Sequence, residues 1–233
     1  VPDYTNQWFP GQPIDVIWDY DVTGIWQTGE AEAATYGLQP GDFKAVDVNG
    51  DGKYVNLEDK RFIGYTAPRY RLGLRNDFTF LKNFTASVFV RADLGHMGAY
   101  PVALNRGYES NDRWNRNVGP VPYWTADRPN DEYARLNPIV SSFGGGIMIY
   151  KPRSFVRIQD VSLVYNLPTS LAHRIKLNNL QIFGAARNLA TFTKWPGWDP
   201  ESGDPNPPPG NTQDEPGMLP MPRTYTFGLS FSL

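Results

Sequence analysis

An aspartate-rich segment near residue 50 has the residue types and spacing of a calcium-binding loop. Asp47, Asn49 and Asp51 place side-chain oxygens at alternate positions, and a glycine follows them. Calcium prefers hard oxygen ligands, and such loops supply them from positions 1, 3 and 5 before a turn glycine. The remaining ligands would be the Lys53 carbonyl at position 7 and the Glu58 carboxylate at position 12, with Asp59 as the competing carboxylate one place later. The spacing therefore predicts a calcium site, and a metal-free Asn-Gly/Asp-Gly turn is the alternative.

A second set of candidate residues consists of aromatic side chains in regions rich in Gly, Pro, Asn and Asp. Flat aromatic faces beside polar groups can stack on sugar rings or contact peptide side chains. The residues in this set are Trp114, Tyr123, Trp124, Trp195 and Trp198. We treat them as candidates for substrate or partner binding, and packing within the loops is the alternative.

Few residues of this chain could carry out catalysis, and we expect no enzymatic activity. The sequence has no cysteine and only two histidines, which excludes a thiol nucleophile and a multi-histidine metal centre. Asp199, Glu201 and Asp204 could be mistaken for catalytic carboxylates, but we predict a solvated loop, because no regular element would fix their separation. The 22 basic and 24 acidic residues nearly balance, so no nucleic-acid-binding surface is expected.

The elements that must position these residues are predicted to be long β-strands. Residues 224–233 alternate strictly, with Tyr225, Phe227, Leu229 and Phe231 on one face and small or polar residues on the other. Ten residues is also the length that a tilted membrane-spanning strand needs. Similar but less regular patterns predict five further strands, at 13–27, 69–80, 84–93, 154–167 and 180–189. The chain is therefore predicted to be all-β, with about six strands.

The connections between these strands alternate between short and long. Residues 81–83 and 168–179 form short links, whereas 28–68, 94–153 and 190–223 are long and rich in Gly, Pro, Asn, Asp and Trp. Outer-membrane barrels show this pattern, with short periplasmic turns and long extracellular loops. Six strands with two open edges cannot close such a barrel, so we expect this chain to be a downstream piece of a longer protein.

A series of short motifs in a fixed order carries a family resemblance. The motifs are GIWQ at 24–27, PGD at 40–42, DVNGDGK at 47–53, DKRFIG at 59–64, SFVRIQDVSL at 154–163, YNLP at 165–168, RNLATFTK at 187–194 and GWDPE at 197–201. Together with the closing strand, the series resembles the C-terminal end of a SusC/RagA-type TonB-dependent outer-membrane transporter. Two departures are the closing Leu233, where an aromatic residue is commoner, and an aspartate-rich loop that is one residue longer.

The resemblance implies a 22-stranded transmembrane β-barrel in the outer membrane of a Gram-negative bacterium of the Bacteroidota type. Residues 1–233 would supply its last strands, and the plug and the N-terminal strands would be absent from this chain. The implied partners are the rest of the barrel and plug, a SusD-like surface lipoprotein, TonB and the lipid bilayer. The implied cargo is an oligosaccharide or a peptide, and Ca²⁺ is the one cofactor expected. Counting strands back from a periplasmic chain end places the aspartate-rich loop outside the cell.

The strand pattern alone leaves a second interpretation open. A secreted β-sandwich that binds glycans would show the same alternation, because each strand would bury its apolar face against a second sheet. In that case the aspartate-rich segment would be a structural calcium loop. The two interpretations differ in whether the apolar strand faces are covered by protein or by lipid.

Overall fold

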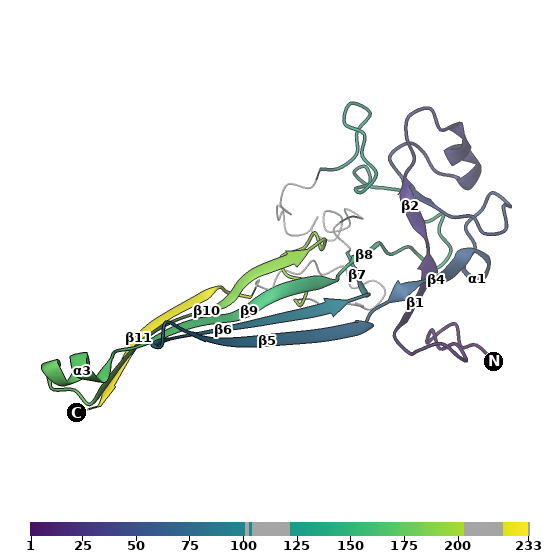
Figure 1. Ribbon diagram of the computed structural model, residues 1–233. Coiled ribbons are helices and arrows are strands. Elements are labelled where there is room, and N and C mark those ends of the chain that lie inside the picture. Colours follow the sequence, from purple (N-terminus) through teal and green to yellow (C-terminus); the bar gives the residue numbers. More distant parts are fainter. Residues whose placement is uncertain (101–102, 104–121, 203–220, 233) are drawn as a thin grey trace, which may run out of the picture. The chain divides into compact units, whose positions relative to one another are not determined.

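The computed structural model of this chain describes residues 1–100, 103, 122–202 and 221–232. These residues form two compact units, which Figure 1 shows. The first, called the loop unit here, contains residues 1–67 and the described residues between 96 and 152. The second, called the sheet unit, contains residues 68–95, 153–202 and 221–232. Among the described residues, no helix is long and apolar enough to cross a membrane.

The sheet unit is built on one antiparallel sheet of five long strands in the order β11-β10-β9-β6-β5. The strands are β5 (Tyr70–Phe80), β6 (Phe84–Leu94), β9 (Phe155–Asn166), β10 (Asn179–Thr193) and β11 (Thr224–Ser232). Five of the strands predicted from the sequence are therefore confirmed. β9 contains a bulge, because its pairing with both neighbours shifts register between Ile158 and Asp160.

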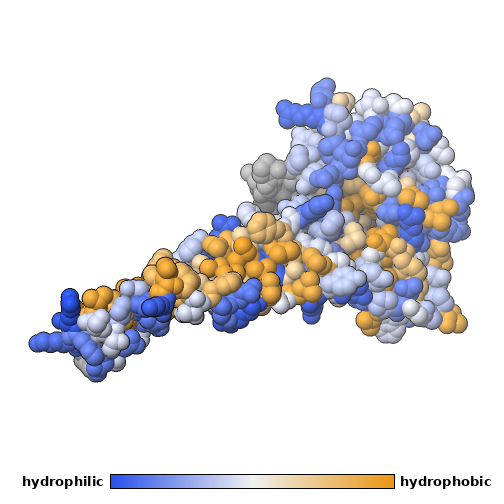
Figure 2. Space-filling view, in the orientation of Figure 1, coloured by the Kyte–Doolittle hydropathy of each residue, from blue (hydrophilic) through white to orange (hydrophobic). Residues whose placement is uncertain are grey.

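The strand register places most apolar side chains of this sheet on one face, while Phe89, Phe155 and Phe183 lie on the other. Leu74 pairs with Val90, Val90 with Ile158, and Leu229 with Ile182, so the apolar positions of neighbouring strands line up. These side chains are largely exposed: Phe227 is 82% and Leu229 66% accessible. Figure 2 shows hydrophobic side chains gathered along the strands of the sheet. This unit therefore presents its apolar surface outward.

The opposite face of the sheet is polar, because successive strand residues point to opposite sides. On each strand, the residues of this polar face alternate with those of the apolar face, and the observed register brings polar-face residues of neighbouring strands side by side. The charged residues of this polar face are Arg71, Arg75, Asp77, Arg91, Asp93, Arg157, Asp160 and Arg187. Thr226, Gly228 and Ser230 of β11 lie on the same face. The sheet is thus amphipathic across its thickness.

The short connections of the sheet all lie at one end. Leu81 and Lys82 turn β5 into β6 with positive φ angles, the left-handed conformation that tight hairpins use. The link from β9 to β10 contains α3 (Thr169–Ala172) and η3 (His173–Ile175). In Figure 1 the β5–β6 turn, α3 and the C-terminus share this end of the sheet. The other end of the sheet holds the first residues of β5, β9 and β11 and the last residues of β6 and β10. The long connections attach at that end.

The loop unit contains three small two-stranded sheets. β1 (Val16–Tyr20) pairs with β4 (Lys60–Tyr65), β2 (Val22–Ile25) with β3 (Phe43–Ala45), and β7 (Met97–Ala99) with β8 (Tyr150–Pro152). It also contains η1 (Ala31–Tyr36) and α1 (Asn56–Asp59).

An aromatic core holds the loop unit together. Tyr20, Phe43 and Phe143 are buried to 2% exposure or less, and the rings of Tyr54 and Phe143 stack with centroids 4.6 Å apart. Tyr20 and Phe143 come from chain segments on either side of the β5–β6 hairpin. The segment before β5 and the one between β6 and β9 are therefore one folded unit rather than separate loops.

Residues 13–27 differ from the sequence prediction of a single long strand. They form β1 and β2, which pair with β4 and β3 instead of joining the five-stranded sheet. All five residues of β1 are buried, including Asp19, whose carboxylate lies 2.9 Å from the Lys60 ammonium. A buried carboxylate needs such a partner, and Lys60 lies on the neighbouring β4. The period-two pattern therefore failed where a strand is buried on both faces.

Candidate functional site

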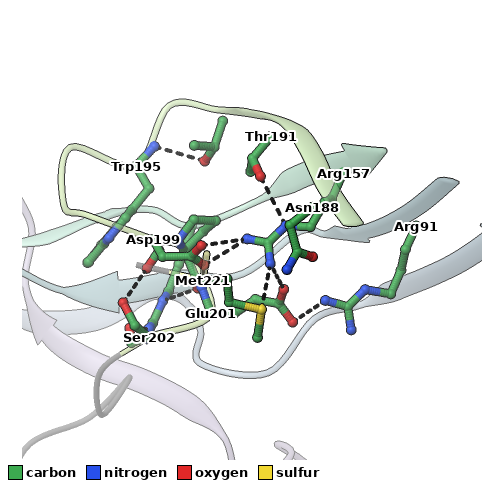
Figure 3. Close-up of polar contacts among 12 residues, drawn as sticks. Arg91, Arg157, Asn188, Thr191, Trp195, Asp199, Glu201, Ser202 and Met221 are labelled. Carbon is green, nitrogen blue, oxygen red and sulfur yellow. Dashed lines mark hydrogen bonds and ion pairs between the residues drawn. The ribbon is translucent and has the colours of Figure 1, made fainter. Parts of the chain in front are cut away.

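The polar face of the sheet unit carries a cluster of arginines that holds the chain segment after β10. Arg91 lies on β6, Arg157 on β9, and Arg153 just before β9. Arg91 and Arg157 contact the carboxylates of Asp199 and Glu201, and Arg153 contacts backbone carbonyls of the same segment, 195–202, which follows β10. We call these three arginines with Asp199 and Glu201 the arginine clasp, and Figure 3 labels its Arg91, Arg157, Asp199 and Glu201.

Arg157 is the centre of the clasp. Its Nη2 donates to both carboxylate oxygens of Asp199 at 2.8 Å, and its Nη1 lies 2.6 Å from Glu201 Oε2. Its Nε donates to Thr191 Oγ1 at 3.0 Å. The Arg157 side chain is only 1% exposed, so the ion pair with Asp199 is almost fully removed from solvent. A buried charge pair of this kind is tolerated only with good hydrogen-bonding geometry, and Arg157 has that geometry.

The other two arginines fix the same segment from either side. Arg91 pairs with the second carboxylate oxygen of Glu201, so that Glu201 bridges two arginines. Arg153 donates from Nε to the Pro200 carbonyl at 2.7 Å and from Nη2 to the Ser202 carbonyl. Its guanidinium also lies 5.0 Å from the Trp195 ring centroid, within the range of a cation–π contact.

The clasp corrects the prediction of a solvated loop for Asp199 and Glu201. Asp199 is 6% exposed, because strand arginines supply the partners that make its burial possible. Sequence reasoning missed Arg91, Arg153 and Arg157. The sequence did contain a signal for Arg91 and Arg157, because both lie inside strands and a buried arginine in a strand needs a carboxylate nearby. Asp204, the third carboxylate considered, lies outside the described residues.

Contacts also fix the chain where it approaches β11. Arg157 Nη1 lies 3.0 Å from Met221 Sδ, and Asn188 Nδ2 donates to the Pro222 carbonyl at 3.1 Å. Asn188 has a φ of 52° and sits where the β9–β10 register shifts. The segments on both sides of residues 203–220 are therefore attached to the polar face.

The four candidate aromatic residues that the structure describes are divided between the two units and differ in exposure. Trp124 and Trp195 are buried, and the Trp124 indole donates to Gln27 Oε1 at 2.8 Å in the loop unit. Tyr123 and Trp198 are 41% and 76% exposed, in the loop unit and the sheet unit respectively. Trp114 lies outside the described residues. Of the four candidates that the structure describes, Tyr123 and Trp198 are the accessible ones.

The aspartate-rich loop folds into a compact turn of hydrogen bonds. Asp47 accepts the backbone N–H groups of Gly50 at 2.7 Å and Gly52 at 2.8 Å, and the Tyr36 hydroxyl at 3.2 Å. Burial alone would raise the pKa of Asp47, but these hydrogen bonds outweigh it and hold the pKa below its usual value. Similar turns follow, because Asn49 Oδ1 accepts the Asp51 N–H and Asp51 Oδ1 accepts the Lys53 N–H.

Asp59, rather than Glu58, closes this loop. Its two carboxylate oxygens accept the N–H groups of Val48 at 2.9 Å and Val55 at 2.7 Å, and its side chain is fully buried. Glu58 instead accepts from the Asn49 amide at 2.8 Å. Within the part of the chain that the structure describes, no group of three or more His, Cys, Asp or Glu side chains is placed to hold a metal ion.

Curated relatives identify the class of protein to which this chain is similar. It is 28% identical over 228 residues to the TonB-dependent receptor P3 of Formosa agariphila, and 24% identical over 230 residues to the TonB-dependent receptor P26 of the same organism. Both matches cover 94% of this chain but only 22% and 23% of the relatives. The chain thus spans less than a quarter of their length. No protein-family model matches it.

Solved structures show the same fold. The structure of the RagAB peptide transporter matches with a TM-score of 0.59 and 20% identity, covering 93% of this chain and 22% of that chain. The RagAB peptide importer in its open-open state matches with a TM-score of 0.60 and 19% identity, covering 97% and 23%. The five-stranded sheet therefore has the fold of a section of a β-barrel wall. The resemblance inferred from the motifs is confirmed, because nearly the whole chain is similar to part of the TonB-dependent receptors and to part of the RagAB structures.

Proposed function

We propose that this chain forms part of the wall and the extracellular surface of a TonB-dependent importer in the outer membrane of a Bacteroidota-type bacterium. The importer would take up large nutrients, either oligosaccharides or peptides, together with a SusD-like surface lipoprotein. The remaining strands and the plug, through which TonB would act, belong to the rest of the protein. Transport of this kind requires no catalytic residue in the present chain.

The amphipathic five-stranded sheet is the observation that carries this proposal. Its outward apolar face includes Leu72, Leu74, Phe227 and Leu229, each at least 59% exposed. A continuous apolar surface of this kind is costly in water and is stabilised by contact with lipid. In the sheet unit no second sheet packs over this face, as a secreted sandwich would require. The polar face would then line the lumen.

The positions of the short and long connections support a direction for the barrel. All described short turns lie at one end of the sheet, as periplasmic turns do in outer-membrane barrels. The loop unit, which contains the described parts of residues 28–68 and 94–153, attaches to strands at the other end. We assign that end to the outside of the cell, where a capping lipoprotein and the cargo would dock.

The test is made on the full-length protein in its own membrane. A barrel of this type is expected to require detergent for extraction and to migrate differently on a gel before and after boiling. Deletion of its gene should abolish growth on the cargo, and a tagged version should co-purify with a surface lipoprotein. Extraction in buffer without detergent would overturn the proposal. A normal barrel without a lipoprotein partner would overturn only the SusD-like partnership.

We also propose that the aspartate-rich loop binds Ca²⁺. The side-chain oxygens of Asp47, Asn49 and Asp51 each accept backbone N–H groups, and an ionised carboxylate oxygen retains a further lone pair for a metal. Extracellular Ca²⁺ is plentiful enough for a weak site with a Kd of about 10⁻⁴–10⁻³ M. Protease resistance of this loop in the full-length protein should rise with Ca²⁺ and not with Mg²⁺, and Asp51→Asn should weaken the response. Equal resistance with Ca²⁺ and a chelator would exclude the site.

A further inference from the structure

A half-enclosed pocket in the loop unit is not used by the function proposed so far. It has a volume of about 350 Å³ and lies beside β2 and the segment 148–151, with Ile63 and Met97 contributing from β4 and β7. Every residue that lines it belongs to the loop unit. The volume is sufficient for one large side chain of a bound molecule.

The wall of the pocket combines aliphatic and aromatic side chains. Ile63, Met97 and Met148 contribute flexible or branched aliphatic groups. Tyr20 and Phe43 are 0% and 1% exposed, so their rings are already covered, whereas Tyr150 is partly exposed. Methionines adapt to an aliphatic chain, and such a chain can also pack along an aromatic ring. The wall therefore suits an aliphatic stem.

The rim of the pocket carries more acidic than basic groups among the described residues. Asp21, Asp131 and Glu132 face Lys151 there. Asp21 pairs with Arg61, and Glu132 lies 3.9 Å from the Lys151 ammonium. Asp131 Oδ1 instead accepts a hydrogen bond from the neutral amide of Gln27 at 3.0 Å, so its charge is not balanced by that contact. Asp131 is thus the rim carboxylate best placed to pair with an incoming cation.

We propose that this pocket binds the side chain of a lysine or arginine residue of a peptide. The aliphatic stem would lie on Met97 and Met148, and the cationic head would reach Asp131 at the rim. Lysine and arginine side chains combine an aliphatic stem, which buries readily, with a charged end that stays near water. The inference rests on the proposed import function and selects peptides over oligosaccharides as the molecules that contact this surface.

The experiment uses the full-length protein in detergent and three matched peptides. The probe is a capped pentapeptide with a central lysine between alanines, and the comparison peptides carry norleucine or acetyl-lysine at the same place. Calorimetry should give at least tenfold tighter binding of the lysine peptide. The preference should fall about fivefold or more when NaCl is raised from 50 to 500 mM, because the rim is partly open to solvent.

Two variants separate the pocket from general electrostatics. Asp131→Asn should remove most of the preference for lysine and leave norleucine binding unchanged. Asp127→Asn is the control, because Asp127 is an exposed aspartate in the same segment that does not line the pocket. Heat-modifiable gel migration checks that each variant folds.

Each outcome decides the proposal. Equal binding of the lysine and norleucine peptides, binding of oligosaccharides alone, or an unchanged preference in Asp131→Asn would each overturn it. If the protein still behaves as a detergent-extracted barrel that supports nutrient uptake, such a result removes the pocket and leaves the proposed function intact. Loss of the barrel behaviour would instead overturn the proposed function.

Discussion

The loop unit and the sheet unit place their large apolar residues in opposite ways. In the loop unit, Tyr20 and Phe43 are almost fully buried. In the sheet unit, Phe227 and Leu229 are 82% and 66% exposed, whereas the charged Arg157 is 1% exposed. One short chain therefore contains a unit with an aromatic interior and a unit with an apolar exterior.

The difference indicates that the two units remove their apolar side chains from water in different ways. Apolar side chains leave water by packing together in the loop unit, as in any globular domain. The sheet unit has one layer, so its apolar face can leave water only by contacting something outside this unit, and lipid is the medium that we propose. Its polar face must then stabilise charges without a thick core, which explains why arginine and carboxylate groups are clustered there.

Removal of Arg157 is expected to have the largest effect. Arg157→Ala would leave Asp199 buried without its main partner, and breaking a buried pair in this way costs about 3–5 kcal/mol. The urea midpoint of the full-length protein in vesicles should fall accordingly, and protease should cut within 195–202. Arg187→Ala is the matched control, since the Arg187–Asp160 pair is exposed and worth about 0–1 kcal/mol. Equal losses of stability in the two variants would show that burial of the arginine clasp adds nothing to the stability of the protein.

The aromatic core of the loop unit provides the second test. Phe43→Ala removes a ring that is 1% exposed, and such a truncation costs about 3–5 kcal/mol. Hydrogen exchange should speed up in the loop unit, including residues 139–149 across the core, and remain slow in the five strands. Phe227→Ala is the control, because its ring is 82% exposed and should contribute little to the loop unit. Uniform acceleration in both units would contradict two separate cores.

How far the sequence predicts the structure differs between the sheet unit and the loop unit. Strict alternation predicted β11 and its faces, and the short and long connections predicted which strand ends lie together. Alternation could not predict that residues 13–27 form two short strands outside the five-stranded sheet, because a strand buried on both faces, as β1 is with Asp19 paired to Lys60, has no polar side. The shared core was also hidden, since Tyr54 and Phe143 are 89 residues apart and their contact depends on long-range packing. Arg157 and Asp199 are also far apart in the sequence, so their contact could not be predicted, although both residues lie in motifs that carry the family resemblance.

The outward face of the sheet provides the third test. Leu229 lies on the apolar face opposite Ile182, and an arginine at the bilayer midplane of a barrel costs about 2–4 kcal/mol. Leu229→Arg should therefore lower the stability of the full-length protein in lipid, measured by heat-modifiable migration across a urea series. Ser230→Arg is the control, because Ser230 lies on the polar face opposite Gln181 and its substitution should cost much less. A larger loss in Ser230→Arg would mean that the faces are reversed.

The smallest expected effect concerns pH and the aspartate-rich loop. Hydrogen bonds from Gly52, Gly50 and Tyr36 outweigh burial and lower the pKa of Asp47, so its ionised form is favoured in the folded loop. A lowered pKa contributes stability above the unfolded value of about 3.9, and this contribution disappears as the pH falls through the folded pKa. Asp47→Asn should therefore make residues 47–53 exchange faster than wild type at pH 7, and the difference should vanish as the pH falls through the folded pKa of Asp47. The measurement is made in a chelator, because bound Ca²⁺ would lower the pKa further and enlarge the difference. A difference that grows as the pH falls would show that Asp47 is protonated in the folded loop.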